Sequence, residues 1–323
     1  MLVYMNVLPR GGAHGGANAF LRSLVAELGR RGVRTTTDTS EPFDIALLNA
    51  LTGGLELDTV RRLADRWRPL VHRKTGYLGR GSVGQRQIVG GAVLGDTQQV
   101  AFDPYLAHTI FQSRYSRDVF VAAGHRGASS VIWNGVDEAV FNAADRRFWR
   151  PREPLEVLVS SWSSDENKGF PEYSRIDGQL AGRVDVRVTL VGRAPENANL
   201  RNIRVLGARG PHRLAGTLRR GHVILQLAKW ETCSNALLEG LNCGLPAVYL
   251  DSGANAEIAA HYGVAYEGDL FAALETLRPR YDDIVASLPE NPYRIRLVAD
   301  RYVAVFEAVL AGRTPESAEV TSR

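Results

Sequence analysis

Glu231 and Glu239 stand eight positions apart in the stretch KWETCSNALLEGLNCGLPAVYLDSGANAE, whose other residues are mostly small or apolar. Ser234 is a suitable N-cap residue for a short helix, NALLEGLNC, and Gly244 is suited to end that helix. Glu231 is therefore predicted to lie in the loop before the helix, and Glu239 within it. The free N–H groups and the dipole at the helix start favour a bound anion such as a phosphate.

The order of these groups indicates the chemistry of a ligand. A carboxylate one turn into the helix, such as Glu239, can accept two hydrogen bonds from a diol, as acidic residues do for ribose in dinucleotide folds. Glu231, on the other side of the phosphate site, is placed to hold sugar hydroxyls. A diphosphate flanked by a ribose and a sugar is a nucleotide sugar. The alternative is a solvated helix face, because the leucines of this helix already supply a buried side.

The composition is that of an ordinary globular enzyme. The chain has 323 residues, of which 45% are hydrophobic and 23% charged, and this length predicts two domains. The net charge of +4 permits acidic ligands or an anionic membrane surface but requires neither. We expect no nucleic-acid partner, because the sequence has no RNP-type motif, zinc spacing or basic stripe with interleaved aromatic residues.

The cysteines and the hydropathy pattern bear on the compartment. Cys233 and Cys243 belong to no C-x-x-C pair, which argues against a zinc site or a disulfide framework and fits a reducing compartment. The N-terminal MLVYMNVLPRGG lacks the charged region and the long apolar run of a signal peptide. No stretch approaches the ~18–20 apolar residues that span a bilayer. We therefore expect a cytoplasmic protein, at most peripheral to the inner membrane face.

Short apolar strands alternate with amphipathic helices, which is the pattern of an α/β protein with open parallel sheets. In the first half the predicted strands cover residues 2–8, 44–49, 68–74, 107–113 and 129–137, and a glycine loop at 11–16 leads into a helix at 17–32. The pattern restarts after a charged linker, with predicted strands at 155–163, 185–192, 202–207, 222–228 and 246–251.

This repetition predicts two Rossmann-like parallel-sheet domains, residues 1–150 and 151–292. Ligands of such folds lie at the carboxyl ends of the strands, here in a central cleft that the two domains face. A closing helix at 293–311 is expected to pack across the domain junction. The polar tail, 312–323, is expected to be disordered.

Several motifs in this order resemble retaining glycosyltransferases of family 4, which have the GT-B fold. The E-x7-E arrangement of Glu231 and Glu239, followed by GLNCGLPAVYLDSGANAEI, resembles the family's donor-binding signature. The segments GGAHGGANAFLRSLVAELGRRGV, TIFQSRYSRDVF with VIWNGVD, and SSWSSDENKGF with VTLVGR resemble other parts of the family, so the resemblance covers nearly the whole chain. It implies a hexosyltransferase-type enzyme that moves a sugar from a nucleoside-diphosphate sugar, UDP more than GDP, to a hydroxyl group.

The resemblance also implies the roles of individual residues in donor binding. Glu239 binds the donor ribose and Glu231 binds hydroxyls of the transferred sugar. Lys168 neutralises the departing diphosphate. The residues that contact the diphosphate are Ser234, Asn235 and Ala236.

Further roles follow from the same resemblance. Gly15 and Gly16 are expected to face the reaction centre, and His72 is expected to line the sugar site as a third catalytic residue. Trp162 stands where the family commonly has an arginine that assists the leaving phosphates. Arg193, also a candidate donor contact, and Lys229 are candidates for the missing cation.

The acceptor and cofactor expectations are less specific. The first domain is expected to bind the acceptor through His14 and a basic, glycine-rich segment at 72–87. This segment supplies Arg73, Lys74 and Tyr77. The alternative interpretation of the segment is a solvated loop. The acceptor classes that stay open are cell-envelope glycans, lipid carriers and natural-product scaffolds. No acidic DxD-type cluster appears, so we expect a reaction that needs no metal and no cofactor. The oligomeric state is not predicted.

Two other functions remain as alternatives. An NAD-dependent sugar-nucleotide oxidoreductase or epimerase would explain a glycine loop after a strand with Asp38 roughly 20 residues later, but the loop lacks the G-x-G-x-x-G order and no catalytic Tyr-x-x-x-Lys is present. A non-catalytic nucleotide-sugar-binding protein would explain the departure at Trp162.

Overall fold

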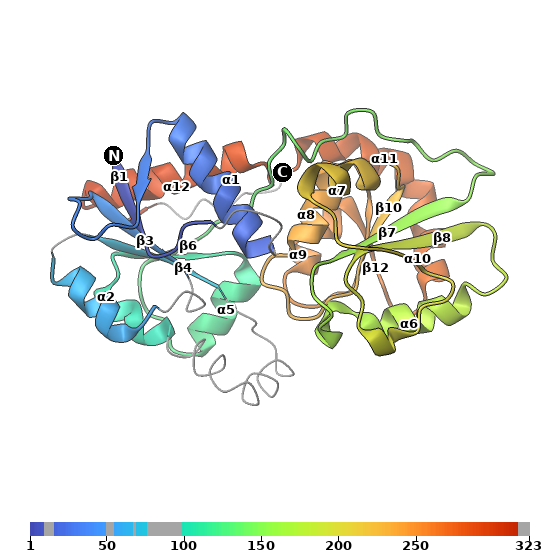
Figure 1. The fold of residues 1–323 in the computed structure, drawn as a ribbon, viewed down its shortest axis with the longest axis horizontal. Helices are drawn as coiled ribbons and strands as arrows, with labels where there is room; N and C mark the ends of the chain where they lie inside the picture. The colour runs from blue at the N-terminus through green and yellow to red at the C-terminus, as the bar shows by residue number, and fades with distance from the viewer. Residues whose placement is uncertain (10–15, 50–54, 67–68, 76–98, 316–323) are drawn as a thin grey trace. The chain divides into compact units, whose positions relative to one another are not determined.

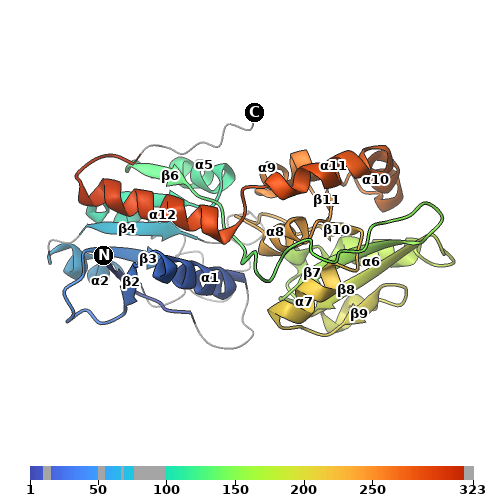
Figure 2. The ribbon, with the colours of Figure 1, turned by 90° about the horizontal axis from the view of Figure 1, so that it is seen from above.

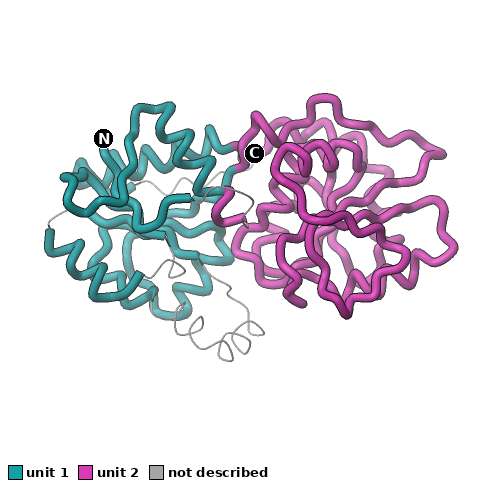
Figure 3. Tube along the Cα trace, in the orientation of Figure 1, with its two compact units in different colours: residues 1–10, 20–135, 295–323 teal, residues 11–19, 136–294 magenta. Residues whose placement is uncertain are grey.

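The computed structural model describes residues 1–9, 16–49, 55–66, 69–75 and 99–315. The chain divides into two compact units (Figure 3). Unit 1 comprises residues 1–10, 20–135 and 295–323, and unit 2 comprises residues 11–19 and 136–294. Each unit has a six-stranded parallel sheet with helices packed on it (Figures 1 and 2), so the predicted α/β architecture is confirmed.

The sheet of unit 1 has the strand order β2-β1-β3-β4-β5-β6. Its strands are β1 (Leu2–Met5), β2 (Arg34–Thr36), β3 (Ile45–Asn49), β4 (Leu70–Lys74), β5 (His108–Phe111) and β6 (Ser129–Val131). Its helices are α1 (Gly16–Arg30), which begins in residues assigned to unit 2, α2 (Leu57–Ala64), η1 (Gln99–Tyr105), α5 (Arg114–Ala122) and α12 (Ile295–Leu310). Strands β3 and β4 are buried along their whole length, as is usual for strands of a parallel sheet that is covered on both faces.

The closing helix α12 belongs to the core of unit 1. Its apolar stripe, including Val298, Tyr302 and Phe306, packs with Val3 and Phe20 in one buried cluster. The sequence predicted that this helix would cross the domain junction, and the structure instead accounts for its apolar face within unit 1. The reason is that the stripe at helical spacing meets the apolar faces of α1 and the central strands.

The sheet of unit 2 has the strand order β12-β11-β10-β7-β8-β9. Its strands are β7 (Leu155–Ser161), β8 (Val186–Gly192), β9 (Arg204–Leu206), β10 (Val223–Gln226), β11 (Ala247–Tyr249) and β12 (Gly263–Ala265). Its longer helices are α6 (Phe170–Gln179), α7 (Pro211–Leu218), α8 (Asn235–Asn242), α10 (Leu270–Leu277) and α11 (Tyr281–Ser287); short turns include η2 (Glu166–Lys168) and α9 (Asn255–Ala259).

Residues 136–150 group with unit 2, whereas the sequence placed the boundary at residue 150. The backbone N–H of Val136 donates to the carbonyl of Tyr293 at 3.0 Å. The buried guanidinium of Arg146 donates to the carbonyl of Gly244 and, at 2.9 Å, to the hydroxyl of Tyr281. These bonds tie the predicted linker to unit 2. Most of the predicted disordered tail lies outside the described residues.

Candidate functional site

The candidate donor site lies at the carboxyl ends of the central strands of unit 2. Strands β7 and β8 are paired along seven residues, and their last pair joins Ser161 to Gly192. The loops that leave β7 and β10 carry the residues that the sequence analysis selected. Carboxyl ends of parallel strands are the usual ligand edge of such sheets, because the helices that follow them present their N-termini there.

Lys168 ends a tight turn that is fixed on both sides. The Asp165 carboxylate accepts a hydrogen bond from the N–H of Asn167 at 2.8 Å and so caps the turn. The Asn167 carbonyl accepts from the N–H of Lys229 at 2.7 Å, which ties the turn to the loop after β10. Gly169 has φ of 93°, and a Cβ there would lie 2.8 Å from the Leu227 carbonyl carbon. Glycine is therefore required for this close approach.

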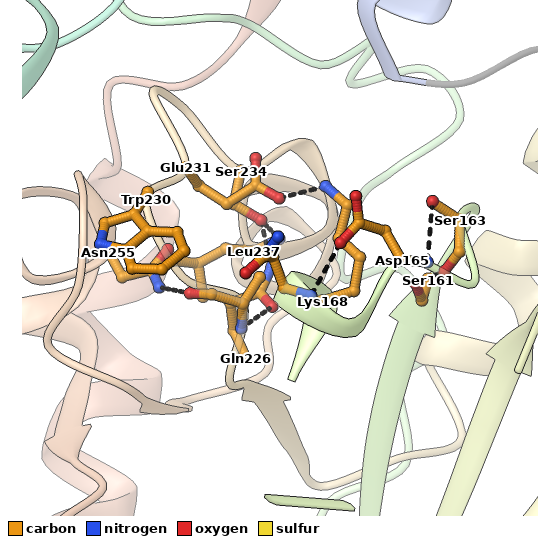
Figure 4. A network of polar contacts seen from close by, with 12 residues as sticks. Ser161, Ser163, Asp165, Lys168, Gln226, Trp230, Glu231, Ser234, Leu237 and Asn255 are labelled. Atoms are coloured by element: carbon orange, nitrogen blue, oxygen red, sulfur yellow. Dashed lines mark hydrogen bonds and ion pairs between the residues drawn. The ribbon is translucent and has the colours of Figure 1, made fainter. Parts of the chain in front are cut away.

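The Lys168 ammonium forms an ion pair with the Glu231 carboxylate (Figure 4). The lysine side chain is 24% exposed and the glutamate side chain 16%, so the pair is reachable from solvent without being freely solvated. The sequence analysis assigned these two residues to adjacent parts of one ligand, and the structure brings them into contact. A cation and a hydrogen-bond acceptor are thus fixed beside each other.

The loop that carries Glu231 is braced by the segment after β11. Trp230 adopts a left-handed φ of 57°, and its N–H donates to the Ser252 hydroxyl at 3.0 Å. The Glu231 carbonyl accepts from the N–H of Ala254 at 2.8 Å. Gly253 also has a positive φ, and a Cβ there would lie 2.5 Å from that carbonyl oxygen. The DSGAN segment therefore positions Glu231, which the local sequence does not indicate.

Ser234 caps α8, as predicted from the sequence. Its hydroxyl oxygen accepts from the N–H of Leu237 at 3.3 Å and also from the side-chain amide of Gln226 (Figure 4). The Ser234 side chain is therefore buried and committed to the cap. Asn235 and Ala236, which follow it, are partly exposed, so the first turn of α8 is accessible for an anion.

Glu239 lies one turn further along α8. It is partly exposed, and no hydrogen bond or ion pair to its carboxylate occurs among the described residues. Burial raises the pKa of Glu239 to about 8. The helix lies close to the sheet, since a Cβ at the next residue, Gly240, would be 2.7 Å from the Ile224 side chain. The direction of this pKa shift is that of a desolvated carboxyl group, which favours a partly enclosed position over a solvated helix surface.

Arg193 and Trp162 contact each other at the same edge of the sheet. The guanidinium carbon of Arg193 lies 5.2 Å from the centroid of the Trp162 ring, which is a cation–π geometry. The N–H of Arg193 donates to the Ser161 carbonyl at 2.9 Å. The sequence analysis singled out both residues but did not predict that they meet.

The predicted acceptor residues Arg73 and Lys74 lie in β4 with buried side chains and not in a solvated loop. Lys74 Nζ lies 2.5 Å from Asp103 Oδ1, and the other oxygen of that carboxylate lies 2.6 Å from Nδ1 of His125. The predicted strand at 68–74 already contained both residues; the correction is that their side chains are buried in the sheet and are not part of an exposed basic segment. Its physical reason is that a carboxylate supplied from η1 compensates the buried ammonium.

The Arg73 guanidinium is held by polar side chains from the segments that follow β5 and β6. Its Nη2 donates to Gln112 Oε1 at 2.8 Å and to Asn134 Oδ1 at 2.7 Å. The guanidinium also lies 4.4 Å from the Phe20 ring centroid. Gln112 and Asn134 follow β5 and β6, and nothing in their local sequence identified them as partners of Arg73.

His72 lies in β4 with no exposed surface. Neither ring nitrogen has a hydrogen-bond partner among the described residues, and the ring centroid lies 5.5 Å from that of Phe102. Burial lowers the pKa of His72 to about 3. The sequence predicted a histidine that lines the sugar site, and the structure shows this side chain enclosed in β4.

Replacing His72 with leucine should make the free energy of unfolding less sensitive to acid. A histidine whose folded pKa is depressed stabilises the fold only above its unfolded pKa, and this contribution is lost as the pH falls toward the folded value. When the pH is lowered from roughly 7 to 4.5, the free energy of unfolding of the variant should fall by about 2–3 kcal/mol less than that of wild type. Urea denaturation at both pH values measures this.

The matched control is His212→Leu, at an exposed position of α7. That substitution should leave the pH profile of stability unchanged. A His72 variant that folds normally but loses most of its turnover would instead support the predicted role of His72 in the sugar site.

The remaining predicted residues are placed only in part. Gly16 is the first residue of α1, and the residues around it, 11–19, are assigned to unit 2. His14, Gly15 and Tyr77 lie outside the described residues.

Within the described ranges, no three His, Cys, Asp or Glu side chains gather as a metal site would require. No described helix is both long enough and apolar enough to cross a membrane.

Comparison with known proteins gives a consistent picture of the domain type. Residues 157–277, which lie in unit 2, match the family described as Glycosyl transferases group 1. The N-acetyl-alpha-D-glucosaminyl L-malate synthase of Bacillus anthracis is 22% identical over 250 residues, which cover 70% of this chain and 65% of that protein. The chain thus spans slightly less than two thirds of that relative.

Solved structures resemble the whole chain. A sucrose-phosphate synthase from Thermosynechococcus elongatus matches with a TM-score of 0.72 and 13% identity, over 96% of this chain and 99% of that one. HepE from Anabaena, solved with UDP and glucose, matches with a TM-score of 0.65 and 15% identity, over 95% of this chain and 100% of that one. The predicted GT-B fold is therefore confirmed. Residues 157–277 thus form a domain of the Glycosyl transferases group 1 type within a chain that has the GT-B fold.

Proposed function

We propose that this chain is a retaining glycosyltransferase of family 4, which transfers a sugar from a nucleoside-diphosphate sugar to a hydroxyl of an acceptor. The observation that carries this proposal is the Lys168–Glu231 ion pair, held beside the capped start of α8 with Glu239 one turn further on. The arrangement offers a cation and helix N–H groups for a diphosphate, and carboxylates on either side for two sets of hydroxyls.

In this proposal the donor diphosphate binds at the first turn of α8, against the N–H groups of residues 234–236. Glu239 accepts hydrogen bonds from the ribose, and Glu231 accepts them from the transferred sugar. Gly15 and Gly16 supply close backbone contacts. Unit 2 is therefore the donor-binding unit and unit 1 the acceptor-binding one. UDP is the favoured nucleotide, which the UDP bound to the structurally similar HepE supports.

The reaction places its largest charge change on the departing diphosphate. Lys168 and the α8 N-terminus are fixed donors for that charge, and fixed donors need no reorganisation in the transition state. When a donor binds, its diphosphate shares the Lys168 ammonium with Glu231, and this carboxylate keeps acceptor sites for sugar hydroxyls. The departing phosphate oxygen takes the proton of the acceptor hydroxyl on the same face of the sugar, so that configuration is retained without a covalent enzyme intermediate. No metal and no other cofactor is needed.

Arg193 is proposed to supply the cation that the family usually places at the position of Trp162. Trp162 follows β7 and Arg193 follows β8, and the last residues of these two strands are paired. The indole ring therefore holds the Arg193 guanidinium at the sheet edge from which the chain continues into the Lys168 turn. Trp162 is then a positioning residue for Arg193.

This role predicts a coupled effect of two substitutions. Arg193→Ala should lower kcat/KM about 10–100-fold, because a charge-assisted hydrogen bond to phosphate is lost. Trp162→Ala should lower it about 2–5-fold through the lost cation–π contact. Steady-state kinetics of the single and double variants measure the coupling.

In the Arg193→Ala background, Trp162→Ala should have no further effect, and Trp162→Phe should retain most of the activity in the wild-type background. Arg187→Ala, at an exposed position of β8, is the matched control. Additive losses from the two substitutions would show that Trp162 does not act through Arg193.

The proposed function is tested by calorimetry with UDP, GDP, ADP and NAD, followed by a transfer assay. Tight binding of one nucleoside diphosphate, and sugar transfer with retained anomeric configuration by NMR, are expected. Turnover should persist after treatment with EDTA. Binding of NAD alone would favour the oxidoreductase or epimerase alternative, and donor binding without turnover for any acceptor class would favour a non-catalytic binding protein.

A further inference from the structure

The amino-terminal edge of the unit 2 sheet carries a surface that the donor site does not use. The loops that lead into β7, β8 and β10 meet there, because these parallel strands begin at the same edge (Figure 1). The N–H of Leu155 donates to the Asp185 carbonyl at 2.8 Å, and that of Arg147 donates to the Arg219 carbonyl at 2.7 Å. Lys168 and Glu231 follow the opposite, carboxyl-terminal edge.

An aromatic ring is presented to solvent on this edge. Phe148 is 61% exposed, and its ring centroid lies 4.7 Å from the guanidinium carbon of Arg146. Arg146 is itself buried and hydrogen-bonded, so the ring rests on a fixed base. The next residue, Trp149, packs inward, with its ring 5.9 Å from that of Tyr281. Val184, in the neighbouring loop before β8, is 80% exposed.

Positive charge is concentrated in the loop that carries Phe148. The sequence of the loop is RRFWRPR, residues 146–152. Arg147 is paired with Glu153 at 2.7 Å. Arg150, Arg152 and Arg220 are exposed and have no ion-pair partner in the part of the chain that the structure describes. We call Arg147, Phe148, Arg150, Arg152, Val184 and Arg220 the amino-edge patch.

We propose that the amino-edge patch docks on an anionic lipid bilayer. Guanidinium groups bind lipid phosphates, and each arginine near an anionic surface contributes an attraction that salt screens. An exposed aromatic ring among them inserts into the interfacial layer of the bilayer, at the boundary between the headgroups and the acyl chains. The combination fits a peripheral contact. It does not depend on the proposed sugar transfer, because it lies at the opposite edge of the sheet.

Sedimentation of the full chain with lipid vesicles tests this proposal. We expect binding to vesicles of phosphatidylcholine and phosphatidylglycerol in equal parts, weak binding to phosphatidylcholine alone, and loss of binding at high salt. Arg150→Gln and Arg152→Gln should each weaken binding about fivefold, and together roughly 25-fold. Phe148→Ala should weaken it further, also at high salt, because its contribution is apolar.

The matched controls are Arg204→Gln and Val205→Ala, at exposed positions of β9 in the same unit. These should bind vesicles as wild type does. Equal binding to both kinds of vesicle, unchanged binding of the Arg150 and Arg152 variants, or binding to a soluble polyanion such as heparin without vesicle binding would overturn the proposal. Nucleotide calorimetry on the same variants should match wild type, which separates this result from a failure of the proposed function.

Discussion

Replacing Lys168 with methionine should lower the kcat of sugar transfer about 10²–10³-fold, while the Kd of the donor rises by less than about tenfold. The reason is that the diphosphate gains negative charge as the glycosidic bond breaks. The ammonium therefore stabilises the transition state more than it stabilises the bound donor. Single-turnover kinetics for chemistry and calorimetry for binding separate the two effects.

A second variant distinguishes this role from simple support of Glu231. Glu231→Gln breaks the ion pair but leaves the Lys168 cation in place, so it should act mainly on binding of the sugar and raise KM. If Lys168 only orients Glu231, the two variants will show the same division between kcat and KM, and the double variant will lose nothing more. Melting temperatures of both variants show whether the ion pair, which is partly exposed, is needed for the fold.

Most of the fold could be predicted from the alternation of apolar strands and amphipathic helices. The strands that the sequence missed are β2 and β12, which have three residues each and lie at the edges of their sheets. A strand of this length carries no alternation, and its pairing is decided by the strand beside it. The packing of α12 in the core of unit 1 could not be predicted, because an apolar stripe at helical spacing does not indicate which core the helix enters.

The candidate site was predictable where the information is local. The Ser234 cap, the helix that follows it and the placement of Glu231 and Glu239 come from residues within a single stretch. The Lys168–Glu231 pair joins residues 63 positions apart, so it required the tertiary structure. The burial of Lys74 was not predictable, because charged side chains are mostly exposed unless paired, and its partner Asp103 is distant in sequence.

Glu239→Gln should weaken binding of the nucleoside diphosphate about 10–100-fold, because the hydrogen bonds between the ribose hydroxyls and the Glu239 carboxyl group are lost. The helix and its cap remain, since Ser234 and not Glu239 holds the start of α8. Calorimetry with UDP and with pyrophosphate gives the specific test. Pyrophosphate lacks a ribose, so its affinity should be nearly the same in wild type and variant.

The same substitution should increase stability at alkaline pH. Burial raises the pKa of Glu239 to about 8, so the folded protein holds this proton more tightly than the unfolded chain does. As the pH rises from the ordinary glutamate pKa through about 8, wild type loses stability that the neutral glutamine does not lose. The variant should match wild type near pH 4 and exceed it by about 1–3 kcal/mol near pH 9.

Urea denaturation of the ligand-free protein at both pH values measures this difference. Glu275→Gln, at a mostly exposed position of α10, is the matched control and should change neither stability nor nucleotide affinity. If Glu239 is a ligand-binding residue, Glu239→Gln should weaken nucleotide binding and yet stabilise the ligand-free protein at alkaline pH. The reason is that a desolvated carboxylate destabilises the empty site that it makes specific. A variant that is less stable at every pH and binds UDP normally would instead make Glu239 a structural residue of α8.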